Sequence, residues 1–258
     1  MAFNERRTEI LKILAKLKTV SVQALTERLQ VSEVTIRKDL SLLETQGILV
    51  RTHGGALLAE DRERLRILSV RSRENLEEKR AIARKARELI REEDTIYLDA
   101  GTTCLTLAQE IRDMSLRVVT NSLEVLVELS RCPQISLLSL GGSYRPEAGS
   151  FIGPAAEEAL KGYQIETCFV GATGISEGGM FSSQNTIETA LKRAVLAASK
   201  RRIILADHTK YGVSAFSIFA KPENIDILIT DSAFKGTERL RALGIEVIPS
   251  PPERGGFV

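Results

Sequence analysis

The sequence predicts two domains: a small helical domain that ends in a β-hairpin, and a larger α/β domain built on a parallel sheet. Residues 1–58 carry three stretches with helical apolar spacing, followed by one stretch in which apolar and polar residues alternate. Residues 79–258 alternate short β-rich runs with helical patterns, which is typical of a parallel sheet with helices on both faces. The highly charged residues 59–78 show neither pattern, so we interpret them as a linker.

The composition is that of an ordinary globular protein. The chain has 258 residues, of which 43% are apolar and 27% charged, which suits one small and one medium domain. No apolar run approaches the roughly 20 residues that span a bilayer, and the opening MAFNERRTEI is too charged for a secretory signal. The three cysteines are far apart, and the two histidines belong to no His/Cys cluster. We therefore expect a cytoplasmic protein with reduced thiols and with neither a metal nor another cofactor.

Each element of the first domain has a local reason in the sequence. Ser21 and Ser32 are suited to cap the second and third helices, and Gly47 ends the third. Residues 48–58 then alternate and turn at Gly54–Gly55, as expected for a hairpin. The first helix presents an apolar stripe at helical spacing, formed by Ile10, Leu11, Ile13, Leu14 and Leu17.

The third predicted helix has a face that suits DNA. Ile36, Leu40 and Leu43 fall on its core side. The opposite side carries two cations, small hydroxyls and one apolar side chain, which can meet phosphates, guanine edges and a thymine methyl in a major groove. Residues 1–58 hold nine Lys or Arg against six Asp or Glu, a local surplus in a chain whose net charge is only +2. The alternative is a small interaction domain whose charged face is merely solvated. The residues on this face are Val34, Arg37, Lys38 and Ser41, with Thr35 at its edge.

Residues 6–57 resemble the winged helix-turn-helix of the DeoR family of bacterial transcriptional regulators. The most specific parts are VSEVTIRKDLSLLE at 31–44 and RTHGGA at 51–56. The resemblance implies that the third helix reads double-stranded operator DNA and that the hairpin is a wing beside the DNA backbone. It also implies that Asp39 orients a neighbouring arginine and does not contact DNA. The implied DNA-binding residues are Ser32, Glu33, Val34, Thr35, Arg37, Lys38, Ser41, Arg51, Thr52 and His53.

The sequence of the second domain predicts seven strands and five helices. Parallel sheets of this kind place ligands at the carboxyl ends of their strands. We expect helices over 79–90, 102–111, 122–130, 186–199 and 236–243. We expect strands at 95–98, 117–119, 135–140, 166–170, 202–205, 225–229 and 245–248.

The stretch TIYLDAGTTCLTLA, residues 95–108, predicts a strand that turns sharply into a helix. Gly101 allows a ligand to approach the backbone, and Thr102 and Thr103 add hydroxyls beside the free N–H groups of the helix N-terminus. This arrangement suits a phosphate, although an ordinary threonine-capped turn has the same pattern. Two further glycine-bearing turns, at Gly141–Gly142 and Gly171, follow other apolar runs, so we expect all three to converge on one sheet edge.

The same domain resembles the sugar-phosphate-sensing domain of the DeoR family, which is similar in turn to ribose-5-phosphate isomerases and the wider CoA-transferase-like fold. The matching pieces are DAGTT at 99–103, VTNS at 119–122, LGG at 140–142, VGATGI at 170–175 and ADHTKYG at 206–212. The resemblance implies a phosphorylated sugar as the effector. The implied effector-binding residues are Lys79, Asp99, Gly101, Thr102, Thr103, Asn121, Gly141, Gly142, Arg145, Gly171 and Lys210.

The residues that move protons in the isomerases are missing or displaced here. The isomerases carry acidic residues just after the strand that matches VGATGI, whereas this chain has none before Glu177. Lys192 stands at the place of their catalytic glutamate, with Glu188 one turn earlier. We therefore expect no enzyme but a repressor of a sugar operon, released from its operator by a phosphorylated sugar. Because one small module reads few base pairs, we expect a homo-oligomer, either a dimer or a tetramer. The alternative is an isomerase-like enzyme with an appended DNA-binding module.

Overall fold

The computed structural model describes residues 3–17, 19–45, 48–51, 54–58 and 74–251. The chain divides into two compact units, Met1–Val70 and Arg71–Val258, called here the N-terminal and C-terminal units. Most of the predicted linker, at 59–73, lies outside the described residues. The last part of that predicted linker, 76–78, forms the first turn of helix α5, which begins at Leu76 and not at Lys79.

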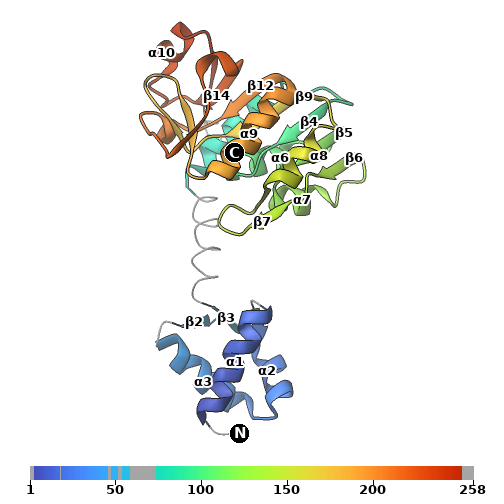
Figure 1. Ribbon diagram of the computed structural model, residues 1–258, viewed down its shortest axis with the longest axis vertical. Coiled ribbons are helices and arrows are strands. Elements are labelled where there is room, and N and C mark those ends of the chain that lie inside the picture. Colours follow the sequence, from blue (N-terminus) through green and yellow to red (C-terminus); the bar gives the residue numbers. More distant parts are fainter. Residues whose placement is uncertain (1–2, 18, 46–47, 52–53, 59–73, 252–258) are drawn as a thin grey trace, which may run out of the picture. The chain divides into compact units, whose positions relative to one another are not determined.

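The N-terminal unit packs three helices against a small antiparallel sheet (Figure 1). Ser21 caps the second helix as expected, since its hydroxyl accepts the N–H of Ala24 at 3.1 Å. A Cβ on Gly55 would lie 2.0 Å from the carbonyl oxygen of Val20, so only glycine fits this crossing. The helices are α1 (Phe3–Leu17), α2 (Val22–Leu29) and α3 (Glu33–Thr45), and the sheet order is β1 (Thr19–Ser21), β3 (Gly55–Leu58) and β2 (Leu49–Arg51).

The core of this unit is the predicted one, with one exception. Ile10 and Leu14 of α1 meet Leu40 of α3, all fully buried. Leu17, which the sequence places in the α1 stripe, is 51% exposed because it lies in the last turn of the helix. Strand β1 was not predicted, since its three residues are too few for an alternation signal.

The C-terminal unit is built on a seven-stranded, fully parallel sheet, and all seven strands were predicted. Most of these strands are nearly continuous apolar runs because both faces of the sheet are covered. In spatial order they are β15 (Glu246–Ser250), β14 (Ile227–Asp231), β12 (Ser199–Leu205), β9 (Ile165–Gly171), β4 (Thr95–Leu98), β5 (Leu116–Thr120) and β6 (Ile135–Ser139).

Helices cover this sheet on both faces (Figure 1). Ile96 and Leu98 of β4 pack into one apolar cluster, and Tyr97 between them packs into the other. The first cluster includes residues of α5 (Leu76–Arg87), α6 (Thr102–Glu110) and α7 (Leu123–Leu129). The second includes residues of α8 (Pro154–Leu160), α9 (Thr186–Ala198) and α10 (Thr237–Ala242). Helix α8 was not predicted, because it is short and starts directly after Gly153.

Several small elements lie in the connections between the strands and helices of this unit, and none of them was predicted. They contain only two to four residues each, too few for a periodic signal. They are the hairpin of β7 (Ser143–Arg145) and β8 (Ser150–Ile152), the antiparallel sheet of β10 (Gly174–Ile175), β11 (Phe181–Ser183) and β13 (Ser217–Ala220), and the 3₁₀ turns η1 (His208–Lys210) and η2 (Pro222–Asn224).

The strand order reverses between β4 and β9. From β4 the chain continues through β5 and β6 toward one edge, whereas β9, β12, β14 and β15 build toward the other. A crevice outside the carboxyl ends of strands is expected at such a switch point. None of the helices among the described residues is long and apolar enough to cross a membrane.

Candidate functional site

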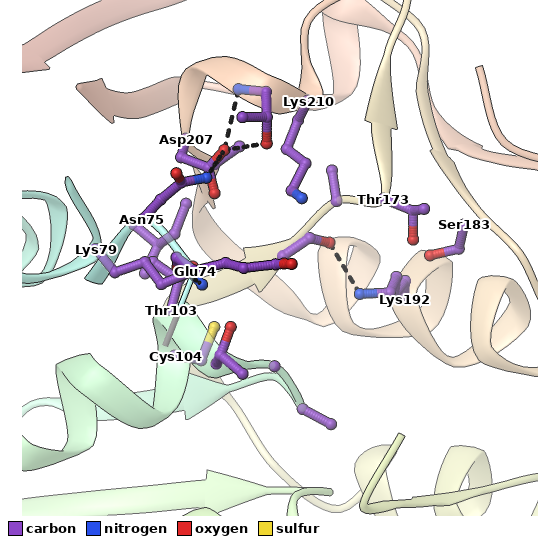
Figure 2. A pocket seen from close by; sticks show the side chains of 18 of the residues that line it. Glu74, Asn75, Lys79, Thr103, Cys104, Thr173, Ser183, Lys192, Asp207 and Lys210 are labelled. Carbon is purple, nitrogen blue, oxygen red and sulfur yellow. Dashed lines mark hydrogen bonds between the residues drawn. The ribbon is translucent and has the colours of Figure 1, made fainter. Parts of the chain in front are cut away.

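A cavity of about 430 Å³ opens at this switch point, beside the carboxyl ends of β4, β9 and β12 (Figure 2). The segment after β4, the end of β9 and the end of β12 all contribute to its wall. Six of the eleven predicted effector residues line it, namely Lys79, Gly101, Thr102, Thr103, Gly171 and Lys210. The structure thus brings these six residues together, and their role in effector binding stays a prediction.

One wall of the cavity is the start of helix α6. Gly101 is the residue before the helix, and Thr102 and Thr103 are its first two residues. The first N–H groups of a helix have no partner within it and carry the positive end of its dipole, so this wall suits an anion. Cys104 follows, fully buried, with its Sγ 3.6 Å from the carbonyl oxygen of Phe169. Burial raises the pKa of this thiol far above its ordinary value, so Cys104 acts as an apolar wall residue and not as a nucleophile.

Two lysines face the cavity from different elements. Lys79 of α5 is 5% exposed, and its ammonium donates to the carbonyl oxygen of Glu74 at 2.5 Å. Lys210 ends the η1 turn and extends toward the centre of the cavity in Figure 2. Within the described part of the chain, no acceptor lies at hydrogen-bond distance from the Lys210 ammonium. This cation is therefore available to a bound anion.

A buried charge pair forms the floor of the cavity. The Lys192 ammonium of α9 donates to the carboxylate of Asp99 and, at 2.9 Å, to the carbonyl oxygen of Gly171. Burial lowers the pKa of Lys192, but the neighbouring Asp99 and Glu188 carboxylates outweigh burial and raise it above its ordinary value. Asp99 also accepts the N–H of Gly171 at 3.0 Å and is only 2% exposed. Asp99 was predicted to contact the effector, whereas the structure places it beneath the cavity as the partner of Lys192.

Four other predicted residues do not line the cavity. Asn121 is buried behind the β4 turn, where its Oδ1 accepts the hydroxyl of Tyr97 at 2.8 Å and the N–H of Ala100 at 3.1 Å. Arg145 donates to Glu188, a residue of the wall, at 2.9 Å and so acts one contact away from the cavity.

Gly141 and Gly142 follow β6, so they share the carboxyl edge of the parallel sheet with the other glycine turns as expected. However, β6 is the outermost strand, and these two residues do not line this cavity. The structure gives another reason for Gly142. A Cβ there would lie 2.7 Å from the carbonyl oxygen of Ile152, and its φ of +107° disfavours other residues.

Sequence reasoning missed several cavity residues. Asp207 and Thr209 lie within the ADHTKYG motif, so their neighbour Lys210 could have indicated them. Thr173 lies in the turn between β9 and β10, and Ser183 lies in the short strand β11, and neither segment gave a periodic signal. The other missed residues of the wall with charged or amide side chains are Glu74, Asn75, Glu188 and Lys192.

The predicted DNA-binding face of α3 is open to solvent. Val34 is 63% exposed, and Arg37 and Lys38 are exposed beside it. The Arg51 guanidinium of β2 donates to the Ser41 hydroxyl at 2.7 Å and thereby joins the hairpin to the helix. Ser32 and Glu33 begin this face, Thr35 is half-buried at its edge, and Thr52 and His53 lie outside the described residues.

Asp39 lies on the inner side of the same helix and is 1% exposed. Its carboxylate forms ion pairs with Arg6 and Arg7 of α1. The expected pairing of Asp39 with an arginine is therefore present, and its lack of contact with DNA stays a prediction.

Comparisons with known proteins agree with this division. Residues 6–62 match the DeoR-like helix-turn-helix domain, and residues 74–232 match the DeoR C terminal sensor domain. The transcriptional repressor AccR of Agrobacterium fabrum is 34% identical over 254 residues, which cover 96% of each chain. The HTH-type transcriptional repressor GlcR of Bacillus subtilis is 33% identical over 97% of this chain and 98% of its own. The lactose phosphotransferase system repressor of Lactococcus lactis is 35% identical over 88% of this chain and 91% of its own.

Similar solved structures are more remote. Ribose 5 phosphate isomerase A from Neisseria gonorrhoeae is 20% identical with a TM-score of 0.39, over 53% of each chain. The delta subunit of eIF2B from Chaetomium thermophilum is 16% identical with a TM-score of 0.46, over 60% of this chain and 56% of its own.

Proposed function

The chain belongs to the DeoR family of transcriptional regulators, and we propose that it represses an operon of sugar metabolism until a phosphorylated sugar binds its C-terminal cavity. The observation that carries this proposal is the cavity at the switch point, where the α6 N-terminus meets Lys79 and Lys210. That arrangement supplies backbone N–H groups, two hydroxyls and two ammonium groups from separate elements, which is the chemistry that recognises a phosphate.

The rest of the cavity suits a polyhydroxylated carbon chain. Thr173 and Ser183 supply hydroxyls, and Glu188 supplies a carboxylate. The Glu188 oxygens already accept from Arg145 and from Ser183, which fixes their orientation. Oriented acceptors and donors of this kind discriminate between sugars by the positions of their hydroxyls. The relatives fit the assignment, because one of them is the repressor of a lactose phosphotransferase system.

An isomerase is supported less well by the same residues. Proton transfer between neighbouring carbons needs a carboxylate or another base that is free to take a proton. Here Asp99 is paired with Lys192, and Glu188 is paired with Arg145. The three sequence relatives named above are all called repressors.

On the DNA side, the exposed face of α3 is the part that we assign to the major groove, with Arg37 and Lys38 as the main cations. Arg51 is assigned to the DNA backbone beside the groove. The protein acts as a homo-oligomer in this proposal, because a symmetric pair of such helices reads two half-sites and reaches a useful specificity. A bound sugar phosphate weakens operator binding by favouring one arrangement of the two units over another.

Fluorescence anisotropy on DNA from just upstream of the gene for this chain tests the proposal. The titration is repeated at fixed salt with ribose 5-phosphate, glucose 6-phosphate, fructose 6-phosphate, fructose 1-phosphate and tagatose 6-phosphate. We expect specific binding that one of these compounds weakens, and its unphosphorylated parent sugar serves as the control. Operator binding that no sugar phosphate changes would contradict the effector assignment. Turnover of one of the phosphates by the protein would favour the isomerase instead.

A further inference from the structure

The first described residues of the C-terminal unit line its cavity. The sensor-domain match starts at residue 74, and Glu74 and Asn75 both line the cavity. The helix-turn-helix match ends at residue 62, so these two residues are the first of the sensor domain to follow the segment that leads from the DNA-binding module. An occupant of the cavity therefore meets the chain where it enters the sensor domain.

Asn75 stands before α5 in an unusual conformation. Its φ and ψ are 50° and 43°, which is the left-handed region that asparagine tolerates better than most residues. Its side chain makes no capping hydrogen bond to α5. Asn185 shows the ordinary alternative, because it precedes α9 with extended backbone and accepts the N–H groups of Ile187 and Glu188. The Asn75 side chain is thus used for something other than capping its helix.

That side chain contacts the turn that carries Lys210. The Asn75 amide donates to Oδ1 of Asp207 at 3.4 Å, as Figure 2 shows. Asp207 is 1% exposed, and the same oxygen accepts the N–H of Thr209 at 3.0 Å as well as the Thr209 hydroxyl. One buried carboxylate oxygen therefore joins the entering chain to the η1 turn.

Lys79 makes a second link to the entering chain. Its ammonium donates to the carbonyl oxygen of Glu74, one turn before it. A phosphate that binds this ammonium would share its three protons with the Glu74 carbonyl, because an ammonium donates to several acceptors at once. A phosphate at Lys79 and Lys210 would thus bind to one of these contacts and next to the turn that makes the other.

We propose that the turn Glu74–Lys79, held by Asn75 to Asp207 and by Lys79 to Glu74, transmits occupancy of the cavity to the DNA-binding module. This inference rests on the proposed function, since it concerns regulation by the same cavity. Asn75 acts as a positioning residue in this proposal. It contributes to the coupling between the sugar phosphate and the operator DNA more than to the affinity for either of them. Coupling of this kind is a ratio of affinities that holds in both directions.

The test compares the full chain with Asn75→Gly, which removes the amide and keeps a residue that accepts the left-handed backbone. For each protein, anisotropy gives the operator Kd with and without a saturating amount of whichever phosphate in the panel above weakens wild-type binding most. We expect a wild-type ratio between about 5 and 150, and a ratio at least about fivefold smaller for Asn75→Gly. Asn75→Asp, which sets two carboxylates against each other, should lower the ratio in the same way.

Asn224→Gly is the matched control. Its side chain accepts the N–H of Lys221 at 3.0 Å and lies outside this cavity, so the ratio should equal that of the wild type. Hydrogen exchange of the peptide that covers Asn75–Lys79 adds a readout without DNA. The sugar phosphate should change exchange there in the wild type and much less in Asn75→Gly.

Each result has a definite meaning. A responsive wild type and an equally responsive Asn75→Gly would overturn the transmission role and leave the proposed function intact. Loss of sugar-phosphate binding by Asn75→Gly in calorimetry would also overturn it, because Asn75 would then be a direct ligand. A wild type that no phosphate of the panel affects would overturn both the inference and the proposed function.

Discussion

Replacement of Lys192 by methionine tests the buried charge pair beneath the cavity. The Lys192 ammonium lies 5.4 Å from the ring centre of Phe219. Methionine keeps most of the apolar part of the side chain and removes the charged ammonium. The Lys192 and Asp99 side chains are only 4% and 2% exposed, so the pair is largely shielded from solvent. Asp99 would keep the N–H of Gly171 as a donor but would have no cation beside it. Breaking a buried pair from one side in this way costs about 3–5 kcal/mol.

Thermal unfolding followed by circular dichroism measures this loss. For a unit of this size, about 3–5 kcal/mol corresponds to a Tm lower by roughly 6–20 °C in the transition of the C-terminal unit. The double variant Asp99→Asn, Lys192→Met removes both charges, and the new amide oxygen can still accept from Gly171. We expect the double variant to be more stable than Lys192→Met alone, which is the signature of a coupled pair.

Lys85→Met is the matched control on the surface. Lys85 pairs with Glu88 at 2.6 Å, but the two side chains are 37% and 62% exposed. Such a pair contributes about 0–1 kcal/mol, so the Tm should hardly change. The buried pair is not important for stability if Lys192→Met lowers the Tm no more than Lys85→Met does. The two residues are not coupled if the double variant loses as much stability as Lys192→Met and Asp99→Asn together.

Four further predictions concern other parts of the molecule. Arg37→Ala or Lys38→Ala should weaken operator binding and reduce its salt dependence, while sugar-phosphate binding in calorimetry stays unchanged. The double variant Thr102→Ala, Thr103→Ala should lose sugar-phosphate binding and keep operator binding. If folded variants of both kinds lost both activities, the division of roles would be wrong. Asp39→Asn leaves Arg6 and Arg7 without their buried carboxylate and should destabilise the N-terminal unit by about 3–5 kcal/mol; an unchanged unfolding transition for that unit would refute this. The three cysteines are buried, and burial raises the pKa of Cys168 to about 11, so a thiol reagent at pH 8 should react only after unfolding; rapid reaction of the native protein would show an exposed thiol. Hydrogen bonding to Arg202 lowers the pKa of Asp226 below its value in the unfolded chain. This pair therefore contributes stability at a pH above the unfolded pKa, and the contribution is lost as the pH falls through the folded pKa. Asp226→Asn should make stability depend slightly less on pH in acid, and an unchanged dependence would contradict this.

The strands of the parallel sheet were predictable because each is a short apolar run, and the loops that follow them are rich in glycine and small polar residues. The same information located the cavity, since the α6 turn lies at the carboxyl end of a strand wherever that strand stands in the sheet. What local sequence does not contain is the order of the strands. Gly141–Gly142 looked equivalent to Gly101 in the sequence, but β6 is an edge strand and β4 is central.

The residues at the floor of the cavity and the wall residue Asn75 could not be predicted from local patterns for a related reason. Lys192 and Asp99 are 93 positions apart, and only the packing of α9 over the sheet brings them together. Asn75 lies within a charged segment that has no periodicity, and its partner Asp207 is 132 positions away. In the N-terminal unit, by contrast, the exposed face of α3 follows from helical periodicity within one element, so it could be derived directly.

The most direct test of the account is calorimetry of the full chain with the phosphorylated and the unphosphorylated form of one sugar, the compound being chosen by the operator assay. We expect the phosphate ester to bind one site per chain and the parent sugar to bind at least about tenfold more weakly. We expect Lys210→Met to weaken the ester by a similar factor, since a charge-assisted hydrogen bond contributes about 1.5–3 kcal/mol. Equal binding of the two sugars, or an ester affinity that Lys210→Met leaves unchanged, would contradict the claim that this cavity recognises a phosphate.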